Sequence, residues 1–159
     1  MQKAAFGDYP RGTLHAMLAE AYAANEPLSR VSEADWRTFD DFVYDNLSVL
    51  ERCGFISMQA GAPAGFITWD PRPLPGGVII GHNCILPAYR GRGRGKEQLG
   101  AALAVIRTLR PGEVTVSTGG SGFFLPARRM YEALGFRETG RTLEGPPPEP
   151  ELVLYRLVP

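Results

Sequence analysis

Hydrophobic residues recur at helical spacing in four segments of the chain, a pattern that buries one face of a helix. The spacing is clearest at Leu99, Leu103 and Ile106. Ser32 and Asp35 have the spacing of a capping box, which places the start of the second helix there. The pattern predicts helices over residues 10–24, from Ser32 to Gly54, over residues 96–109, and from Pro126 to Leu134.

Shorter runs rich in β-branched and aromatic residues, bounded by glycine and proline, predict strands between these helices. The first two strands form a hairpin around residues 61–64. The predicted strands cover residues 55–59, 65–69, 78–86, 114–118, 136–142 and 152–157. Two helices, three strands, a helix, a strand, a helix and two strands follow in order, which predicts a mixed α/β domain around one sheet.

The composition narrows the classes of protein to which the chain can belong. A chain of 159 residues with 44% hydrophobic and 21% charged residues is typical of one globular domain, here residues 1–159. Lys plus Arg and Asp plus Glu number 17 each, so no overall charge favours nucleic acid. No apolar run is long enough for a membrane span, and the N-terminus lacks the apolar core of a signal peptide. Two cysteines and two histidines without ligand spacing predict no metal site, and we expect a cytoplasmic protein.

The segment Arg90–Lys96, with the sequence RGRGRGK, links a predicted strand to a predicted helix. Glycines let a backbone close around an anion, and free amides at a helix start favour phosphate. The segment is not a P-loop, because Glu97 follows Lys96 where Ser or Thr is required, and it lacks the last glycine of the dinucleotide fingerprint. A pyrophosphate site is the functional interpretation, and a glycine-rich basic turn is the structural one.

Two motifs, at residues 90–95 and 127–136, resemble signatures of the GNAT superfamily of N-acetyltransferases. Arg90-x-x-Gly93-x-Gly95 resembles its Q/R-x-x-G-x-G/A signature, and residues 127–136, ARRMYEALGF, resemble its A-x-x-x-Y-x-x-x-G-F signature. The resemblance covers Val78 to Phe136. It implies an α/β, GNAT-like acyl-CoA N-acyltransferase fold, with a central twisted mixed sheet of six to seven strands flanked by four helices. It also implies that two parallel strands splay where the cofactor enters.

The resemblance further implies acetyl-CoA as co-substrate, an amine acceptor and the roles of particular residues. Tyr131 would protonate the departing thiolate, and a core tyrosine on an apolar helix face is the structural alternative. The amide near Ile85 would bond the thioester carbonyl. Many relatives carry Asn where this chain has Phe124, so the resemblance does not decide whether that loop contacts the cofactor. The residues implied to bind the cofactor are Asn83, Cys84 and Ile85 along the pantetheine arm, and Arg90, Gly91, Arg92, Gly93, Arg94, Gly95 and Lys96 at the pyrophosphate.

The amine must lose a proton before attack, and the sequence does not decide which group acts as the general base. His82, on the strand beside the acetyl site, is one candidate, with Glu113 and solvent water as alternatives, and His82 could also be structural. An acyl-Cys84 intermediate is disfavoured because nothing pairs that thiol with a base. Asp40, Asp41 and Asp45 predict an acidic helix face that would either attract a cationic amine or simply face solvent.

Direct transfer of acetyl to an amine in a ternary complex is therefore the predicted function. A non-catalytic acyl-CoA-binding sensor on the same fold is the alternative, and a nucleic-acid-binding domain using Arg90–Arg94 is a third hypothesis. The sequence does not distinguish a small-molecule from a peptide acceptor. It also leaves the oligomeric state open, a homodimer included.

Overall fold

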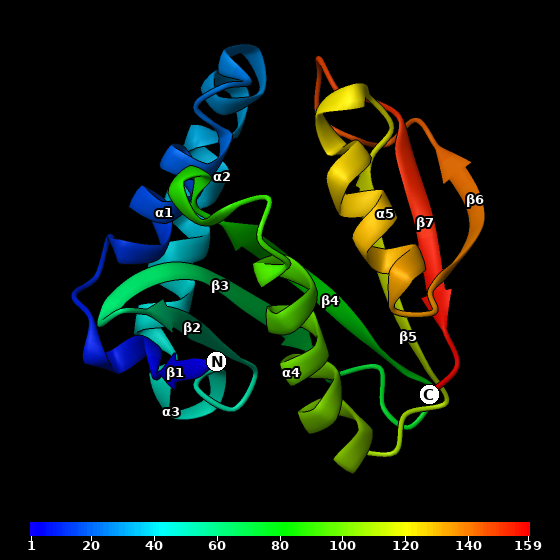
Figure 1. Cartoon of the computed structure of the whole chain (residues 1–159), viewed down its shortest axis with the longest axis horizontal. Coiled ribbons are helices and arrows are strands. Elements are labelled where there is room, and N and C mark those ends of the chain that lie inside the picture. The colour runs from blue at the N-terminus through cyan, green and yellow to red at the C-terminus, as the bar shows by residue number, and fades with distance from the viewer.

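The computed structural model describes all residues from Met1 to Pro159, and its centre is one open, twisted sheet of seven strands (Figure 1). The strand order is β1-β2-β3-β4-β5-β7-β6. Every neighbouring pair is antiparallel except β4 and β5, so the predicted mixed sheet is confirmed. The strands are β1 (Gln2–Ala4), β2 (Gly54–Gln59), β3 (Ala62–Asp70), β4 (Gly77–Ile85), β5 (Glu113–Gly119), β6 (Arg137–Thr142) and β7 (Leu152–Leu157).

Five α-helices cover the sheet, one more than predicted. The helices are α1 (Thr13–Tyr22), α2 (Glu26–Asp45), α3 (Leu47–Leu50), α4 (Arg94–Thr108) and α5 (Leu125–Ala133), with 3₁₀ turns η1 (Phe6–Asp8), η2 (Pro87–Tyr89) and η3 (Gly122–Phe124). Buried residues of α1 and α2 form one hydrophobic cluster with the sheet. Residues of α4 and α5 form the other, so the two helix pairs lie on opposite faces.

The second helix differs from its prediction at both ends. It begins at Glu26, because the side chain of Asn25 accepts a hydrogen bond from the Leu28 amide at 3.4 Å and Pro27 fits the first turn. Ser32 lies inside the helix and is buried, so the capping-box interpretation was wrong. The helix also ends at Asp45, and the separate short helix α3 follows. The three-residue edge strand β1 is too short to give a periodic signal and was not predicted.

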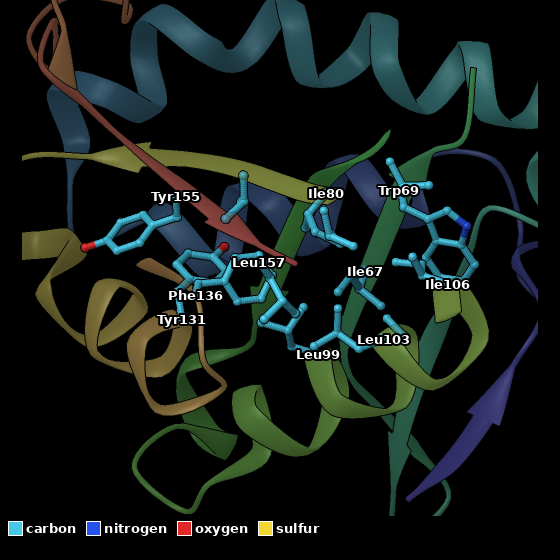
Figure 2. Close-up of a cluster of buried hydrophobic side chains, with 14 of the residues drawn as sticks. Ile67, Trp69, Ile80, Leu99, Leu103, Ile106, Tyr131, Phe136, Tyr155 and Leu157 are labelled. Atoms are coloured by element: carbon cyan, nitrogen blue, oxygen red, sulfur yellow. The ribbon is translucent and has the colours of Figure 1, made fainter. Parts of the chain in front are cut away.

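The core on the α4 side is built from the apolar stripe that the sequence predicted. Figure 2 shows Leu99, Leu103 and Ile106 of α4 lying against Ile67 and Ile80 of the sheet. Each of these side chains is 3% exposed or less, and burying one contributes roughly 1.5–3 kcal/mol to folding. This packing fixes α4 on the sheet, and with it the position of the loop that precedes the helix.

A bulge in β4 changes which side chains face the two layers. Ile80 pairs with Trp69 and Asn83 with Ile67, so β4 holds one more residue than β3 between these pairs. The extra residue reverses the alternation of side chains along the strand. Ile80 before the bulge and Asn83 after it therefore both face the α4 layer, whereas Cys84 packs in the α1–α2 layer.

The parallel strands β4 and β5 separate after a short paired region. They pair only from Gly77 to Ile79 of β4 and from Glu113 to Thr115 of β5. Toward their carboxyl ends the strands diverge, as Figure 1 shows, and residues 80–85 of β4 have no partner on β5. The splay implied by the family resemblance is present.

Candidate functional site

A cavity of about 520 Å³ lies at this splay, between the carboxyl end of β4, the start of α4, the end of α1 and the η3–α5 segment. Every residue predicted to bind the cofactor lines it except Arg92. The two predicted catalytic residues, Tyr131 and His82, do not. The residues predicted to bind the cofactor therefore meet around one cavity, whereas the two side chains predicted to be catalytic lie outside its lining.

The loop before α4 has the backbone geometry of an anion site. Gly91 and Gly93 have φ of 73° and 74°, in the left-handed region where a side chain costs about 1–2 kcal/mol. No side chain caps α4 at Gly93, so the amides of its first turn have no side-chain partner. A Cβ on Gly95 would lie 2.9 Å from the sulfur of Met130, so glycine allows α4 to approach α5 closely. Free amides and the helix dipole together favour a phosphate here.

The cations of the loop are not equivalent. Nε of Arg90 donates to the carbonyl of Ile85 at 2.9 Å, and its Nη2 donates to the carbonyl of Ala21 in α1. Arg90 therefore holds the loop against β4 and α1, and much of its guanidinium is engaged. Lys96 and Arg129 also line the cavity, and neither forms an ion pair. No Asp or Glu lines the cavity, so its charge is positive.

Tyr131 is 4% exposed and packs against Phe136 and Tyr155, with ring centroids 5.7 and 5.8 Å away (Figure 2). Burial raises the pKa of Tyr131 to about 12, and the side-chain amide of Asn83 opposes this shift. Oδ1 of Asn83 accepts a hydrogen bond from Gln98 at 2.8 Å, whereas its buried Nδ2 completes none. Tyr131 thus lies near Asn83, a residue that lines the cavity and has an unused donor.

Neither predicted base reaches the cavity. The His82 ring lies in the α1–α2 layer, with ring centroids 4.3 Å from Phe39 and 6.2 Å from Phe66. Burial lowers the pKa of His82 to about 4, so the imidazole is neutral at pH 7 and weakly basic. Glu113 lies where β4 and β5 are still paired, 3.6 Å from Arg156.

The acidic face predicted on α2 is occupied by contacts within the protein. Asp40 is 2% exposed and accepts hydrogen bonds from the amides of Gly12 and Leu14, at 2.7 and 3.0 Å, at the start of α1. Asp41 and Asp45 both pair with Arg11. Asp40 is therefore a buried helix cap, and for this residue both substrate attraction and a solvated face were wrong interpretations.

An aromatic group closes one side of the cavity and could not be assembled from the sequence. Tyr22 of α1 stacks on Trp36 of α2 at 5.3 Å and lies 6.0 and 6.1 Å from Phe123 and Phe124 of η3. Phe124 packs so closely on Gly119 of β5 that no Cβ would fit there. The group joins the two sides of the splay. The aromatic residues were visible in the sequence, but nothing in their spacing indicated that they meet.

Solved structures identify the fold as that of acetyltransferases. A GNAT-family protein from Desulfovibrio desulfuricans matches with a TM-score of 0.75 at 15% identity, over 99% of this chain and 96% of that one. Aminoglycoside 6′-acetyltransferase type Ii matches at 0.70 and 13%, over 99% and 97%. A GNAT-family acetyltransferase from Elizabethkingia anophelis, solved with acetyl-CoA bound, matches at 0.62 and 14%, over 75% and 82%.

The sequence itself assigns the family. The sequence model of the Acetyltransferase (GNAT) family matches residues 14–136, so the chain belongs to this family, as its two motifs predicted. No curated protein sequence matches it. Family membership supports acyl transfer as the general chemistry. None of the helices combines the length and apolarity that a membrane crossing requires.

Proposed function

We propose that residues 1–159 act as one N-acetyltransferase domain, in which a primary amine attacks acetyl-CoA directly in a ternary complex. The observation that carries the proposal is the cavity at the splay, with its glycine loop, free helix amides and unpaired cations. These groups fit a diphosphate. The buried, unused Nδ2 of Asn83 is a donor for a polar group bound in the cavity.

The backbone would hold the co-substrate in this proposal. Amides from Gly91 to Lys96 bind the pyrophosphate, aided by Lys96 and Arg129. The unpaired edge of β4 from Asn83 to Ile85 receives the pantetheine arm as an added strand. An amide near Ile85 then stabilises the oxygen that becomes negative during attack, a contribution worth roughly 2.7–4 kcal/mol when such a donor is removed elsewhere.

Tyr131 is proposed as the acid that protonates the thiolate of coenzyme A. Its raised pKa keeps the phenol protonated at neutral pH, so the proton is available. A thiol has a pKa near ~8.5, and each unit of mismatch costs ~1.4 kcal/mol, so the phenolate needs a local donor. The Asn83 amide, which opposes the rise in the Tyr131 pKa, would give one of its two N–H groups to the phenolate and leave the other for the bound group. Solvent water would take the proton of the amine, because His82 lies against Phe39 and Phe66 in the other layer.

A binding-only function remains the second candidate because of one observation. Tyr131 is buried in the core and does not line the cavity. A sensor would need the same cavity without an acid. The sensor therefore predicts saturable binding of acetyl-CoA without turnover.

The test is release of free thiol from acetyl-CoA across a library of amines. We expect turnover with at least one amine, and a loss of about 100-fold or more in kcat for Tyr131→Phe, within the usual range for removing a general acid. Tyr155→Phe is the matched control, since Tyr155 is an equally buried neighbour whose hydroxyl bonds Glu132 at 3.2 Å. Equal kcat in the two variants would remove Tyr131 from the mechanism, and binding without any turnover would favour the sensor.

A further inference from the structure

The proposed reaction needs a group that recognises an ammonium ion, and the cavity does not contain one. An alkyl amine is a cation at neutral pH, whereas the charged residues that line the cavity are all basic. Three carboxylates of α2 are engaged, since Asp40 caps α1 and both Asp41 and Asp45 pair with Arg11. Glu33 is likewise bound to Arg37 and His15, each at 2.8 Å. None of these four engaged carboxylates is free to meet the acceptor's charge.

Glu149, in the connection between β6 and β7, is placed to do this. Its Oε1 accepts a hydrogen bond from Oγ of Ser121 at 2.7 Å and one from Nδ2 of Asn25 at 3.4 Å. Ser121 follows β5, and Asn25 caps α2 just after α1. Figure 1 shows the α1–α2 and β6–β7 connections at the same open end of the sheet, on the two sides of the splay. Glu149 thus links the segments that follow α1 and β5, and the nearby residues Tyr22 and Phe123 line the cavity.

The carboxylate of Glu149 has no cationic partner. Both of its donors are neutral, and the residue is partly buried. Its neighbour Glu151 instead pairs with Arg141 at 3.2 Å, and Glu144 in the same connection is exposed. A partly buried charge held only by neutral donors attracts a cation more strongly than a solvated or paired one does.

The connection holds this carboxylate in place before any ligand arrives. The Glu149 amide donates to the carbonyl of Pro146 at 2.8 Å, and the Gly145 amide donates to the carbonyl of Pro150 at 2.9 Å. The Gly120 amide after β5 donates to the carbonyl of Glu151 at 2.9 Å, which ties the connection to the cavity wall. A preorganised group loses little entropy on binding, so the charge is available for recognition.

Aromatic surface lies next to this charge. Tyr22 is three residues from Asn25 and Phe123 two residues from Ser121, and both rings line the cavity. Ring faces bind cations and apolar groups alike. We infer that Glu149 binds the ammonium group of a cationic primary amine whose apolar body lies on Tyr22 and Phe123. This inference rests on the proposed function, because it assigns the acceptor class of the same site.

Binding tests the inference separately from catalysis. A panel of primary alkylammonium ions, 2-phenylethylamine, tryptamine and butylamine, is titrated into the coenzyme A-saturated protein at a pH of about 7.5, where these amines are charged, and binding is followed by calorimetry. We expect the aromatic amines to bind, and Glu149→Gln to weaken them by about tenfold to a hundredfold, the range for a lost charge-assisted hydrogen bond. Glutamine keeps the acceptor oxygen for Ser121 and Asn25, so the fold is preserved.

Two controls isolate the charge. Glu144→Gln removes an exposed carboxylate from the same connection and is expected to leave affinity unchanged. The neutral analogue 2-phenylethanol is expected to bind more weakly, and equally to wild type and Glu149→Gln. Failure of every ammonium ion to bind the wild type, or equal affinity of the wild type and Glu149→Gln for these ions, overturns the inference. Binding that depends on Glu149 without thiol release would instead refute the proposed function alone.

Discussion

His82 illustrates how one inserted residue decides which layer of the fold a side chain faces. The β4 bulge places its ring beside Phe39 and Phe66, in the layer of α1 and α2. Alternation along a regular strand would have placed residues 80, 82 and 84 on one face, and a bulge cannot be located from a single sequence. The sequence therefore identified His82 as a candidate base, and the structure surrounds it with apolar groups.

The partly buried His82 gives the first prediction. Its pKa is about 4 in the folded protein and ~6.5 in the unfolded chain, so the unfolded state takes up the proton first as the pH falls. The stability from neutral His82 is present above pH ~6.5 and is lost as the pH falls toward 4. Between about pH 7 and pH 5 we expect a loss of roughly 2 kcal/mol in the free energy of unfolding.

Urea unfolding at the two pH values measures this loss. His82→Leu keeps an apolar contact with Phe39 and Phe66 and has no proton to bind, so its loss over the same pH interval should be smaller by the same amount. The lowered pKa values of Glu33 and Glu97 act below their ordinary value of 4.5 and leave this window largely untouched. Equal pH dependence in the two proteins would exclude a buried neutral His82.

At the scale of elements, the start of α4 was predicted from the sequence and its partners were not. Gly91, Gly93 and Gly95 predicted an anion loop, and Gly91 and Gly93 do have the left-handed backbone that favours glycine. Arg90 was assigned to the phosphate because its type and position fit the family motif. The structure ties its guanidinium to Ile85 and Ala21, and Ala21 lies 69 residues earlier in the chain. Such long-range contacts depend on packing that no local pattern encodes.

The second prediction concerns the left-handed glycine at the start of this helix. Gly93→Ala should destabilise the protein by about 1–2 kcal/mol, because φ of 74° disfavours a side chain. It should also weaken coenzyme A binding, since the first-turn amides shift. Gly100→Ala, inside α4 with open space where the Cβ would lie, should stabilise by about 0.5–1 kcal/mol and leave binding unchanged.

Thermal unfolding and calorimetry with coenzyme A compare these two variants. The contrast between them separates the general effect of adding a methyl group to α4 from the effect at the anion loop. If Gly93→Ala and Gly100→Ala bound coenzyme A equally well, the backbone of this loop would have no part in the site.

At the scale of the whole molecule, the order of elements was enough to predict a mixed sheet with helices on it. Periodicity, turn residues and the two motifs predicted the central strands and α4 correctly. The motifs also located the cavity, because both flank the same pair of strands. The contacts among Asn25, Ser121 and Glu149, where we infer the acceptor side, were not predicted, because these residues meet only when the chain is folded. Residues that converge from three connections leave no joint pattern in sequence.

The central claim is that the splay between β4 and β5 binds the diphosphate of an acyl carrier through amides at the start of α4. The most direct measurement is calorimetric titration of the folded protein with coenzyme A, acetyl-CoA and pantetheine at low and high salt. We expect saturable binding of both coenzyme A and acetyl-CoA that weakens with salt, and much weaker binding of pantetheine, which lacks the diphosphate. Absence of binding by coenzyme A and acetyl-CoA, or equal binding by pantetheine, would contradict the claim.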